Sequence, residues 1–272
     1  MRAKAIYLAK ALARRLRYGP GDLLHRRRGG AGVPLPPRHL SFVGDSDFEQ
    51  TGREFLGHFT ELGGLRPEDR VLDIGCGIGR MALPLTGYLQ GGSYAGFDVG
   101  REMVRWCSRN ITPRHPEFVF TWAPIHNRKY NPFGDVSAAE FRFPYPDSSF
   151  DFAFATSLFT HLKREETAHY LAETARVLRP GGTCLLTFFL LTPESEAEIA
   201  AGRAGFDFRY PVDGGLTTDP RQPEEAIAFE LDVLRELLGE AGLRLREPIH
   251  FGSWAHAPGA PSMQDIVVAE RV

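Results

Sequence analysis

The chain has 272 residues, of which 43% are hydrophobic and 24% charged, and its formal net charge is −2 at pH 7. A chain of this length can bury a full core without disulfides or metals to hold it together. The small net charge argues against a nucleic-acid-binding protein and against an acidic, solvating one. No apolar run reaches the roughly 18 residues that a membrane span needs.

The cysteines indicate neither a disulfide framework nor a metal site. There are three, Cys76, Cys107 and Cys184, at wide spacings and without a CxxC pair. Buried, reduced thiols are the simpler interpretation, and they fit a cytoplasmic protein. We therefore expect no bound metal.

Positive charge is concentrated at the N-terminus. Residues 1–28 contain nine lysines and arginines but one acid, Asp22, so this segment carries +8 and the remainder −10. The simpler interpretation is a solvated basic helix. The alternative is a basic amphipathic helix that touches a membrane surface or an anionic substrate. Residues 29–40, GGAGVPLPPRHL, predict a linker, so we divide the chain into residues 1–40 and a domain of residues 41–272.

Helices and strands alternate from residue 48 onward. We expect helices at 48–64, 81–89, 101–110, 163–178 and 227–241, and strands at 70–74, 93–98, 118–122, 150–155, 183–190, 243–250 and 264–270. We expect residues 192–225 to be irregular. This alternation predicts an α/β fold, with a mainly parallel sheet that has helices on both faces.

The segment VLDIGCGIGR, residues 71–80, has glycines at alternate positions, Gly75, Gly77 and Gly79, between an expected strand and an expected helix. Glycine lets a ligand approach the backbone because no Cβ is in the way. The dinucleotide fingerprint GxGxxG and the phosphate-binding GK[ST] are both missing. The spacing GxGxG after Asp73 favours a cofactor that places no phosphate on the loop. The alternative is a turn that merely needs flexible residues.

Asp98 ends the next expected strand, nineteen residues after Gly79. A carboxylate at this position can accept hydrogen bonds from both hydroxyls of a ribose. The alternative is a cap for the helix that follows.

Two further segments are FRFPYPDSSFDFAFATSLFTHL, residues 141–162, and ARVLRPGGTCLLTFF, residues 175–189. Together with VLDIGCGIGR and the GFD that ends in Asp98, they resemble, in this order, the motifs of the class I S-adenosylmethionine (SAM)-dependent methyltransferases. The resemblance covers about residues 55–272. It implies a Rossmann-like, seven-stranded, mainly parallel sheet with helices on both faces and an antiparallel last strand.

The resemblance also implies roles for the matched residues. The methionine part of SAM would be held by Asp73 and by the loop residues Gly75, Cys76, Gly77, Gly79 and Arg80. Asp98 would bind the ribose, and Val99 would pack on one face of the adenine. Thr156 and Ser157, after the fourth strand, would close beside the methionine end.

The sequence departs from the family where the adenine is usually recognised. Residues 122–125 follow the third strand, and an insertion, HNRKYNPFGDVSA, separates them from FRFPYPD. Either Glu140, next to Ala139, contacts the adenine amino group, or Ile125 stacks on the ring while backbone atoms make that contact.

The candidate general base is His161. It follows the fourth strand, and ligands of open α/β sheets bind where such strands end. Imidazole titrates near neutral pH and can remove a proton from the methyl acceptor. The alternative is a histidine that packs in a wall of the site or hydrogen-bonds to the backbone.

Residues 192–225 are long for a loop in a compact domain, which predicts a lid over the acceptor. The candidates for acceptor contacts are Tyr130, Phe159, Phe206, Phe208, Arg209, Tyr210 and Trp254. The alternative for the lid is a surface excursion with its own aromatic cluster, and for Phe159 it is core packing.

Together these expectations describe a SAM-dependent methyltransferase that acts on a hydroxyl of a small molecule or glycan and releases S-adenosylhomocysteine (SAH). The alternatives are an N-methyltransferase or natural-product tailoring enzyme and, in another class, a catalytically silent SAM-binding scaffold. The GxGxG spacing disfavours a nicotinamide oxidoreductase. We expect no nucleic-acid partner, because ATSL stands where the nucleic-acid enzymes carry Asn/Asp-Pro-Pro-Tyr/Phe. We expect a cytoplasmic protein, with peripheral membrane contact through residues 1–28 and a homo-oligomer left open.

Overall fold

The computed structural model describes residues 2–24, 32–40, 47–255 and 259–272. The chain divides into two compact units, Met1–Phe141 and Arg142–Val272. Residues 29–31, the first part of the expected linker, lie outside the described residues.

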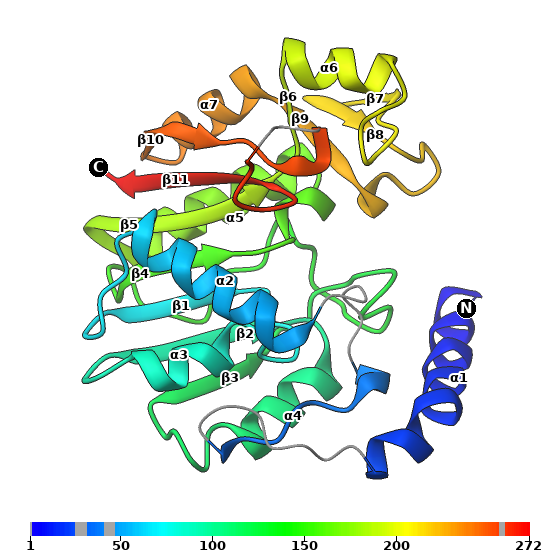
Figure 1. Ribbon diagram of the computed structural model, residues 1–272, viewed down its shortest axis with the longest axis vertical. Helices are drawn as coiled ribbons and strands as arrows, with labels where there is room; N and C mark the ends of the chain where they lie inside the picture. The colour runs from blue at the N-terminus through cyan, green and yellow to red at the C-terminus, as the bar shows by residue number, and fades with distance from the viewer. Residues whose placement is uncertain (1, 25–31, 41–46, 256–258) are drawn as a thin grey trace. The chain divides into compact units, whose positions relative to one another are not determined.

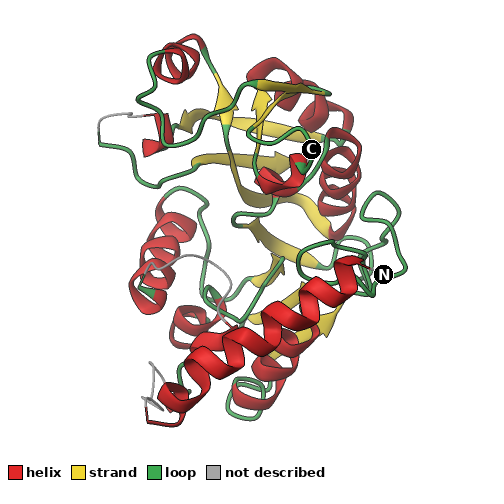
Figure 2. Cartoon of the chain, turned by 90° about the vertical axis from the view of Figure 1, so that its right-hand side faces the viewer, coloured by secondary structure: helices red, strands yellow, loops and turns green. Residues whose placement is uncertain are grey.

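The first unit contains three parallel strands connected by helices (Figure 1). The strands are β1 (Arg70–Ile74), β2 (Ser93–Asp98) and β3 (Phe118–Trp122), and the helices are α1 (Arg2–Leu24), η2 (Arg38–Leu40), α2 (Phe48–Glu61), α3 (Ala82–Tyr88) and α4 (Arg101–Asn110). Figure 2 shows α1 as one continuous helix. Because parallel strands point the same way, the residues that follow β1 and β2 meet at one edge.

Local sequence explains where α2 begins and how closely it packs. The side chain of Asp47 accepts hydrogen bonds from the backbone N–H groups of Glu49 and Gln50, at 3.0 and 2.9 Å, and so caps the helix. Gly52 faces the segment leading into α3, where a Cβ would stand 2.7 Å from the carbonyl oxygen of Arg80. Glycine at this position therefore lets α2 approach the turn that follows the glycine motif.

The second unit contains the remaining strands of the large sheet and a second, smaller sheet. Its strands are β4 (Phe150–Ala155), β5 (Leu178–Phe188), β6 (Leu190–Leu191), β7 (Tyr210–Val212), β8 (Gly215–Thr217), β9 (Ile227–Glu230), β10 (Leu243–His250) and β11 (Asp265–Arg271). Its helices are η3 (Phe159–His161), α5 (Arg164–Val177), α6 (Pro193–Ala200), η4 (Pro223–Glu225), α7 (Leu231–Glu240) and η5 (Ser253–Ala255). The smaller sheet has the strand order β6-β9-β8-β7.

The large sheet has seven strands in the order β10-β11-β5-β4-β1-β2-β3. The strand β11 runs antiparallel to both β5 and β10, whereas β1, β2 and β3 are parallel. This topology confirms the expected seven-stranded, mainly parallel sheet with an antiparallel last strand.

Three expectations about secondary structure are wrong. The strand expected at 183–190 begins at Leu178, which pairs with Phe150, and ends at Phe188. Residues 192–225 are not irregular, because they form α6, β7, β8 and η4. Thr192 caps α6 by accepting a hydrogen bond from Ser195 N, and proline occupies the first helical position. The expected helix 227–241 begins later, at Leu231, because Ile227–Glu230 pairs with β8 as a buried strand. A short apolar run has no period that distinguishes a strand from a helix.

Candidate functional site

The loop after β1 has the backbone shape that its glycines predict. Gly75, Gly77 and Gly79 have φ angles of 86°, 54° and 79°, a range that residues with a Cβ rarely adopt. The N–H groups of Gly75 and Cys76 both donate to the carbonyl oxygen of Phe97 at 3.0 Å. These bonds hold the loop against the end of β2.

Two of the glycines face different surroundings. A Cβ at Gly79 would lie 3.0 Å from Ile111 and 3.1 Å from the sulfur of Cys107, so this glycine lets the loop pack on the end of α4. A Cβ at Gly77 would meet nothing within 4 Å among the described residues. Gly79 is therefore needed for packing, whereas the backbone at Gly77 borders open space.

Asp98 joins the loop to the start of α4. Its Oδ2 accepts a hydrogen bond from Gly77 N at 2.9 Å, and its Oδ1 accepts one from Gly100 N at 2.6 Å. Burial raises the pKa of this half-buried carboxyl above its ordinary value, and the two N–H groups oppose that shift. Asp98 thus connects the glycine loop to the turn before α4. The N-cap of α4 is Gly100, which has no side-chain cap, and the contact of Asp98 with a ribose stays a prediction.

Asp73 lies beneath the loop and is 1% exposed. Tyr94 donates a hydrogen bond from its hydroxyl to Asp73 Oδ2 at 2.6 Å. Burial raises the pKa of Asp73 to about 8, although the bond from Tyr94 opposes the shift, and the charge of Asp98 adds to it. Asp73 is therefore largely protonated at neutral pH, and its contact with SAM stays a prediction.

Val99 and its neighbours form the wall next to Asp98. Val99 is half-buried, and its carbonyl oxygen accepts a hydrogen bond from the indole Nε1 of Trp122 at 3.0 Å. Arg101 lies over the Trp122 ring, 5.2 Å from its centroid. Sequence reasoning missed Tyr94 and Trp122, because nothing local to either residue indicates which strand end its polar atom will contact.

The insertion after β3 is ordered by its own hydrogen bonds. Asn127 Oδ1 accepts from the backbone of Tyr130, and Asn131 Nδ2 donates to the carbonyl oxygen of Ile125, both at 2.9 Å. The Ile125 side chain is 2% exposed, Ala139 is half-buried and Glu140 is exposed. Both alternatives for adenine recognition stay predictions.

Tyr130 belongs to the first unit. It lines a small pocket together with residues of α1, η2 and the start of α4, namely Tyr7, Ala11, Arg15, His39, Leu40, Gly100, Glu102 and Met103. The pocket is next to Gly100, whose N–H is bound by Asp98. The structure therefore places Tyr130 beside the turn that begins α4.

In the second unit, the residue after Thr156 is fixed in an unusual conformation. Ser157 has a φ of 53°, which costs a residue with a side chain conformational energy. Its N–H donates to Thr187 Oγ1 at 2.8 Å and its hydroxyl to Gln264 Oε1 at 3.1 Å, while Thr187 also donates to Gln264 at 2.7 Å. Thr187 on β5 and Gln264, next to β11, thus hold the end of β4. Both were missed from the sequence.

His161 ends the 3-10 helix that follows β4. Its Nδ1 lies 2.9 Å from the carbonyl oxygen of Glu224. A carbonyl only accepts hydrogen bonds, so the neutral ring must carry its proton on Nδ1, which makes Nε2 the basic nitrogen. This backbone hydrogen bond is the alternative that we gave for His161. A general base would use Nε2, and this role stays a prediction.

The aromatic residues of the predicted lid pack against one another. Phe208 and Trp254 are 1% and 2% exposed and belong to a buried cluster with Phe189, against which Phe206 also packs. This is the aromatic cluster that we gave as the alternative to a lid. Two further predicted contact residues, Arg209 and Tyr210, are exposed.

Phe159 is also buried. It is 0% exposed and stacks on Phe188, with ring centroids 4.8 Å apart. Its contacts are those of a core residue, and the acceptor contacts expected of these aromatic residues stay predictions.

The residues around Gly77 and Asp98 fit SAM. The backbone borders open space at Gly77, and each Asp98 oxygen keeps acceptor capacity beyond its one backbone bond. A ribose offers hydroxyl donors to such a carboxylate, and the methionine part of SAM, joined through a sulfonium, needs no phosphate site. Among the described residues, no cluster of three or more His, Cys, Asp or Glu side chains is placed to bind a metal ion.

Comparison with known proteins supports this assignment. A family model described as "Methyltransferase domain" matches residues 72–186. Phthiotriol/phenolphthiotriol dimycocerosates methyltransferase 1 of Mycobacterium ulcerans is 35% identical over 144 residues, 52% of this chain and 44% of that protein. The 27-O-demethylrifamycin SV methyltransferase of Amycolatopsis mediterranei is 34% identical over 143 residues, 49% of this chain and 45% of that protein.

A third relative is the fatty-acid O-methyltransferase of Mycolicibacterium smegmatis, 33% identical over 118 residues, 43% of this chain and 36% of that protein. The chain thus matches less than half the length of each of these relatives.

Solved structures share the fold. A SAM-dependent methyltransferase from Methanosarcina mazei aligns with a TM-score of 0.51 at 21% identity, over 78% of this chain and 96% of that one. Magnesium protoporphyrin IX methyltransferase from Synechocystis with bound SAH aligns with a TM-score of 0.53 at 15% identity, over 86% and 92%. These findings confirm the resemblance to the class I SAM-dependent methyltransferases: residues 72–186 match a methyltransferase domain, and the chain shares the fold of these enzymes.

Proposed function

We propose that this chain transfers a methyl group from SAM to a hydroxyl of a small molecule or glycan. The observation that carries the proposal is the pair of hydrogen bonds from Gly77 and Gly100 to Asp98, next to open space at Gly77. This arrangement presents a carboxylate and a flat strip of backbone to one ligand.

Each group in the first unit has a defined task in this proposal. Asp98 accepts hydrogen bonds from the ribose hydroxyls while Gly77 and Gly100 hold it in place. The positive φ angles at Gly75 and Gly77 keep the loop flat enough for the amino-acid part of the cofactor. Bound SAM supplies a methyl group activated by a positively charged sulfur.

The acceptor's proton is assigned to His161. Glu224 holds the ring through Nδ1, so that Nε2 accepts the proton of the hydroxyl group. Oxygen as the acceptor is supported by the names of two relatives, a 27-O-demethylrifamycin SV methyltransferase and a fatty-acid O-methyltransferase. The names of the relatives also favour a small organic molecule as the acceptor.

The first test is a calorimetric titration of the whole chain with SAH, SAM and NADH, repeated with Asp98→Ala. Asp98→Ala removes a charged acceptor and releases the loop, so we expect SAH affinity to fall about 100-fold, the equivalent of about 2.7 kcal/mol. Asp232→Ala, a change at a carboxylate that is 95% exposed on α7, is the matched control and should bind SAH like the wild type. Binding of NADH in place of SAH and SAM would overturn the proposal.

The acceptor is tested separately with isotope-labelled SAM and panels of hydroxylated metabolites, glycans and amines. Label in a hydroxyl group supports the proposal. Label found in amines alone would contradict oxygen as the acceptor while leaving SAM as the methyl donor.

A further inference from the structure

The outer face of α1 is apolar. Ile6, Leu8, Leu12 and Leu16 on this helix are 46%, 58%, 60% and 71% exposed. The three leucines recur every four residues and therefore lie along one side of the helix. Single exposed apolar residues are ordinary, but a row of them on one helix indicates a contact surface.

The other face of α1 is held by the first unit. Tyr7 packs edge-on against Phe133, with ring centroids 6.1 Å apart. Arg14 donates hydrogen bonds to the carbonyl oxygens of Arg38 and His39, both at 3.1 Å. Because these contacts fix the rotation of the helix about its axis, the leucines are directed away from the unit to which α1 belongs.

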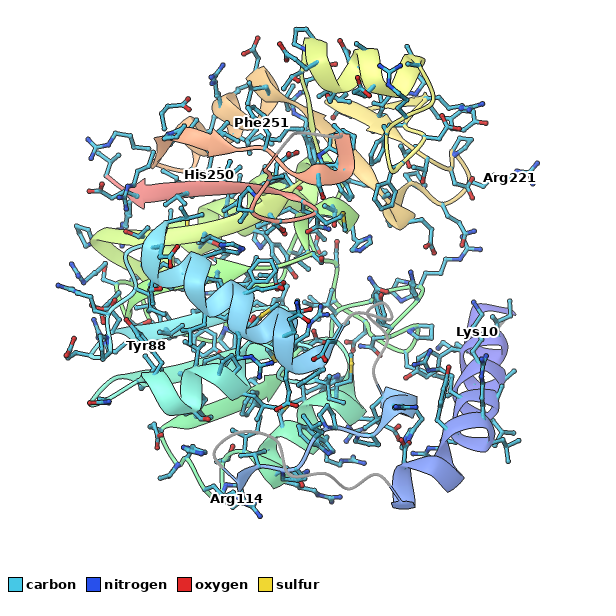
Figure 3. The ribbon with its side chains drawn as sticks, viewed as in Figure 1. Lys10, Tyr88, Arg114, Arg221, His250 and Phe251 are labelled. Atoms are coloured by element: carbon cyan, nitrogen blue, oxygen red, sulfur yellow. The ribbon has the colours of Figure 1, made fainter. Side chains whose placement is uncertain are left out.

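Cations lie along both edges of the apolar face. Each helical residue turns the chain by about 100°, which puts Lys4 and Arg15 at one edge and Lys10 and Arg17 at the other. All four are exposed, and Figure 3 labels Lys10 on α1. Arg15 also pairs with Glu102 at 2.9 Å.

No acidic residue in this part of the helix offsets the positive charge. Residues 1–21 contain neither Asp nor Glu, and the first acid, Asp22, lies 2.8 Å from the ring nitrogen Nδ1 of His39. Arg2 occupies the first position of the helix. The outer surface of α1 is therefore a strip of leucine, isoleucine and alanine bordered on both sides by positive charge.

We propose that α1 docks this protein on a membrane surface that contains anionic lipids. The leucines enter the boundary between head groups and acyl chains, and the flanking lysines and arginines bind lipid phosphates, as in other basic amphipathic helices. The helix would lie on the bilayer, since no helix among the described residues combines the length and apolarity needed to cross one. The proposal does not depend on methyl transfer.

Charge decides between a lipid surface and a second copy of the chain. Two copies of α1 packed through their leucines would bring cationic edges together, with no acid before Asp22 to neutralise them. Like charges at such short range repel. A flat array of lipid phosphates complements both edges at once.

The test is co-sedimentation of the whole chain with vesicles of phosphatidylcholine alone or mixed with phosphatidylglycerol. We expect binding to the mixed vesicles, and we expect Leu12→Glu/Leu16→Glu and Lys10→Glu/Arg17→Glu each to weaken it at least about tenfold. Raising the ionic strength from about 0.1 M to about 1 M shortens the Debye length from about 10 Å to about 3 Å and should also weaken it.

Matched controls carry the same changes elsewhere. Val119→Glu alters an apolar side chain that is 52% exposed on β3, and Arg221→Glu alters an exposed cation of the second unit, also labelled in Figure 3. Both should bind mixed vesicles like the wild type. Circular dichroism and thermal melting establish that every variant is folded.

Two results would overturn the proposal. One is a wild-type chain that fails to sediment with the mixed vesicles. The other is a dimer that Leu12→Glu/Leu16→Glu converts to a monomer while vesicle binding stays unchanged, because that would assign the apolar face to a second copy.

Discussion

The loop after β1 and the aromatic segment of residues 189–264 use their side chains in opposite ways. In the loop, Asp98 is tied to the backbone at Gly77, and the space beside this glycine is open. In the aromatic segment, Phe208 and Trp254 close on Phe189 and are almost inaccessible. The loop thus leaves open space beside its backbone, whereas the aromatic segment uses its rings to stabilise its own fold.

The difference suggests a rule for reading sequences: glycines in a strand-to-helix turn are a better guide to a binding surface than aromatic residues are. Three glycines at positive φ have few purposes other than close approach or packing. Aromatic residues stabilise a core and bind ligands by the same burial of apolar surface. Four experiments test this contrast, and they follow in order of decreasing expected effect.

His161→Ala tests the proposed general base, whose ring is hydrogen-bonded to the backbone carbonyl of Glu224. Loss of a general base should lower kcat about 10²- to 10⁴-fold while SAH affinity is retained. The measurement is turnover with an acceptor identified in the screen. His169→Ala on α5 is the matched control, and equal turnover in the two variants would remove the role from His161.

Phe208→Ala tests whether the aromatic cluster is a core. Removing this buried ring should lower the free energy of unfolding by about 3–5 kcal/mol. Tyr210→Ala, at a side chain that is 39% exposed, should change it by less than about 1 kcal/mol. Urea denaturation measures both free energies of unfolding. If Phe208→Ala left the stability unchanged but raised the KM for the acceptor, the result would support the predicted lid.

Asp73→Asn tests whether burial beneath the loop raises the pKa of this carboxyl. The ordinary pKa of the carboxyl is 3.8, and burial raises it to about 8. Between those values the folded protein keeps a proton that the unfolded chain has lost, so stability falls as pH rises. This contribution amounts to at most about 1.4 kcal/mol per pH unit, and above pH 8 it changes no further.

Asparagine does not titrate, so the Asp73→Asn variant should lack this slope. Urea denaturation of both proteins at pH 5, 6 and 7 measures the difference. Parallel pH profiles would show that Asp73 is ionised in the folded protein.

Gly77→Ala and Gly79→Ala form a matched pair within the loop. Both place a Cβ on a residue with positive φ, which costs about 1 kcal/mol. Gly79→Ala should lose more stability, because its Cβ meets Ile111 and Cys107. Gly77→Ala should lose more SAH affinity, because its Cβ enters the open space. Thermal melting and calorimetry separate the two losses, and the reverse pattern would contradict the assignment of that space to the cofactor.

Much of the fold could be predicted from local sequence. The strands 70–74, 93–98, 118–122, 150–155 and 243–250 match the structure residue for residue. Four of the five directly follow a glycine or an acidic residue, which limits where a strand can begin. Ile227–Glu230 escaped prediction because its pairing with β8 outweighs the helical pattern that follows it.

The partners of the site residues were harder to predict. Tyr94 and Asp73 are 21 residues apart, and Ser157 and Gln264 are 107 apart. The sequence around a hydroxyl or an amide does not indicate which distant residue it will bind. The partners depend on strand order and register, which the whole sheet sets.

The sequence by itself determined the chemistry that depends on a single residue or its neighbours. The missing Cβ permits the positive φ of Gly75, Gly77 and Gly79, and the cationic character of α1 follows from a run without acids. The tertiary structure alone decided which side chains are buried, and so placed Phe159, Phe208 and Trp254 in the interior and raised the pKa of Asp73. Burial is the reason for this division, because it depends on contacts between residues far apart in the chain.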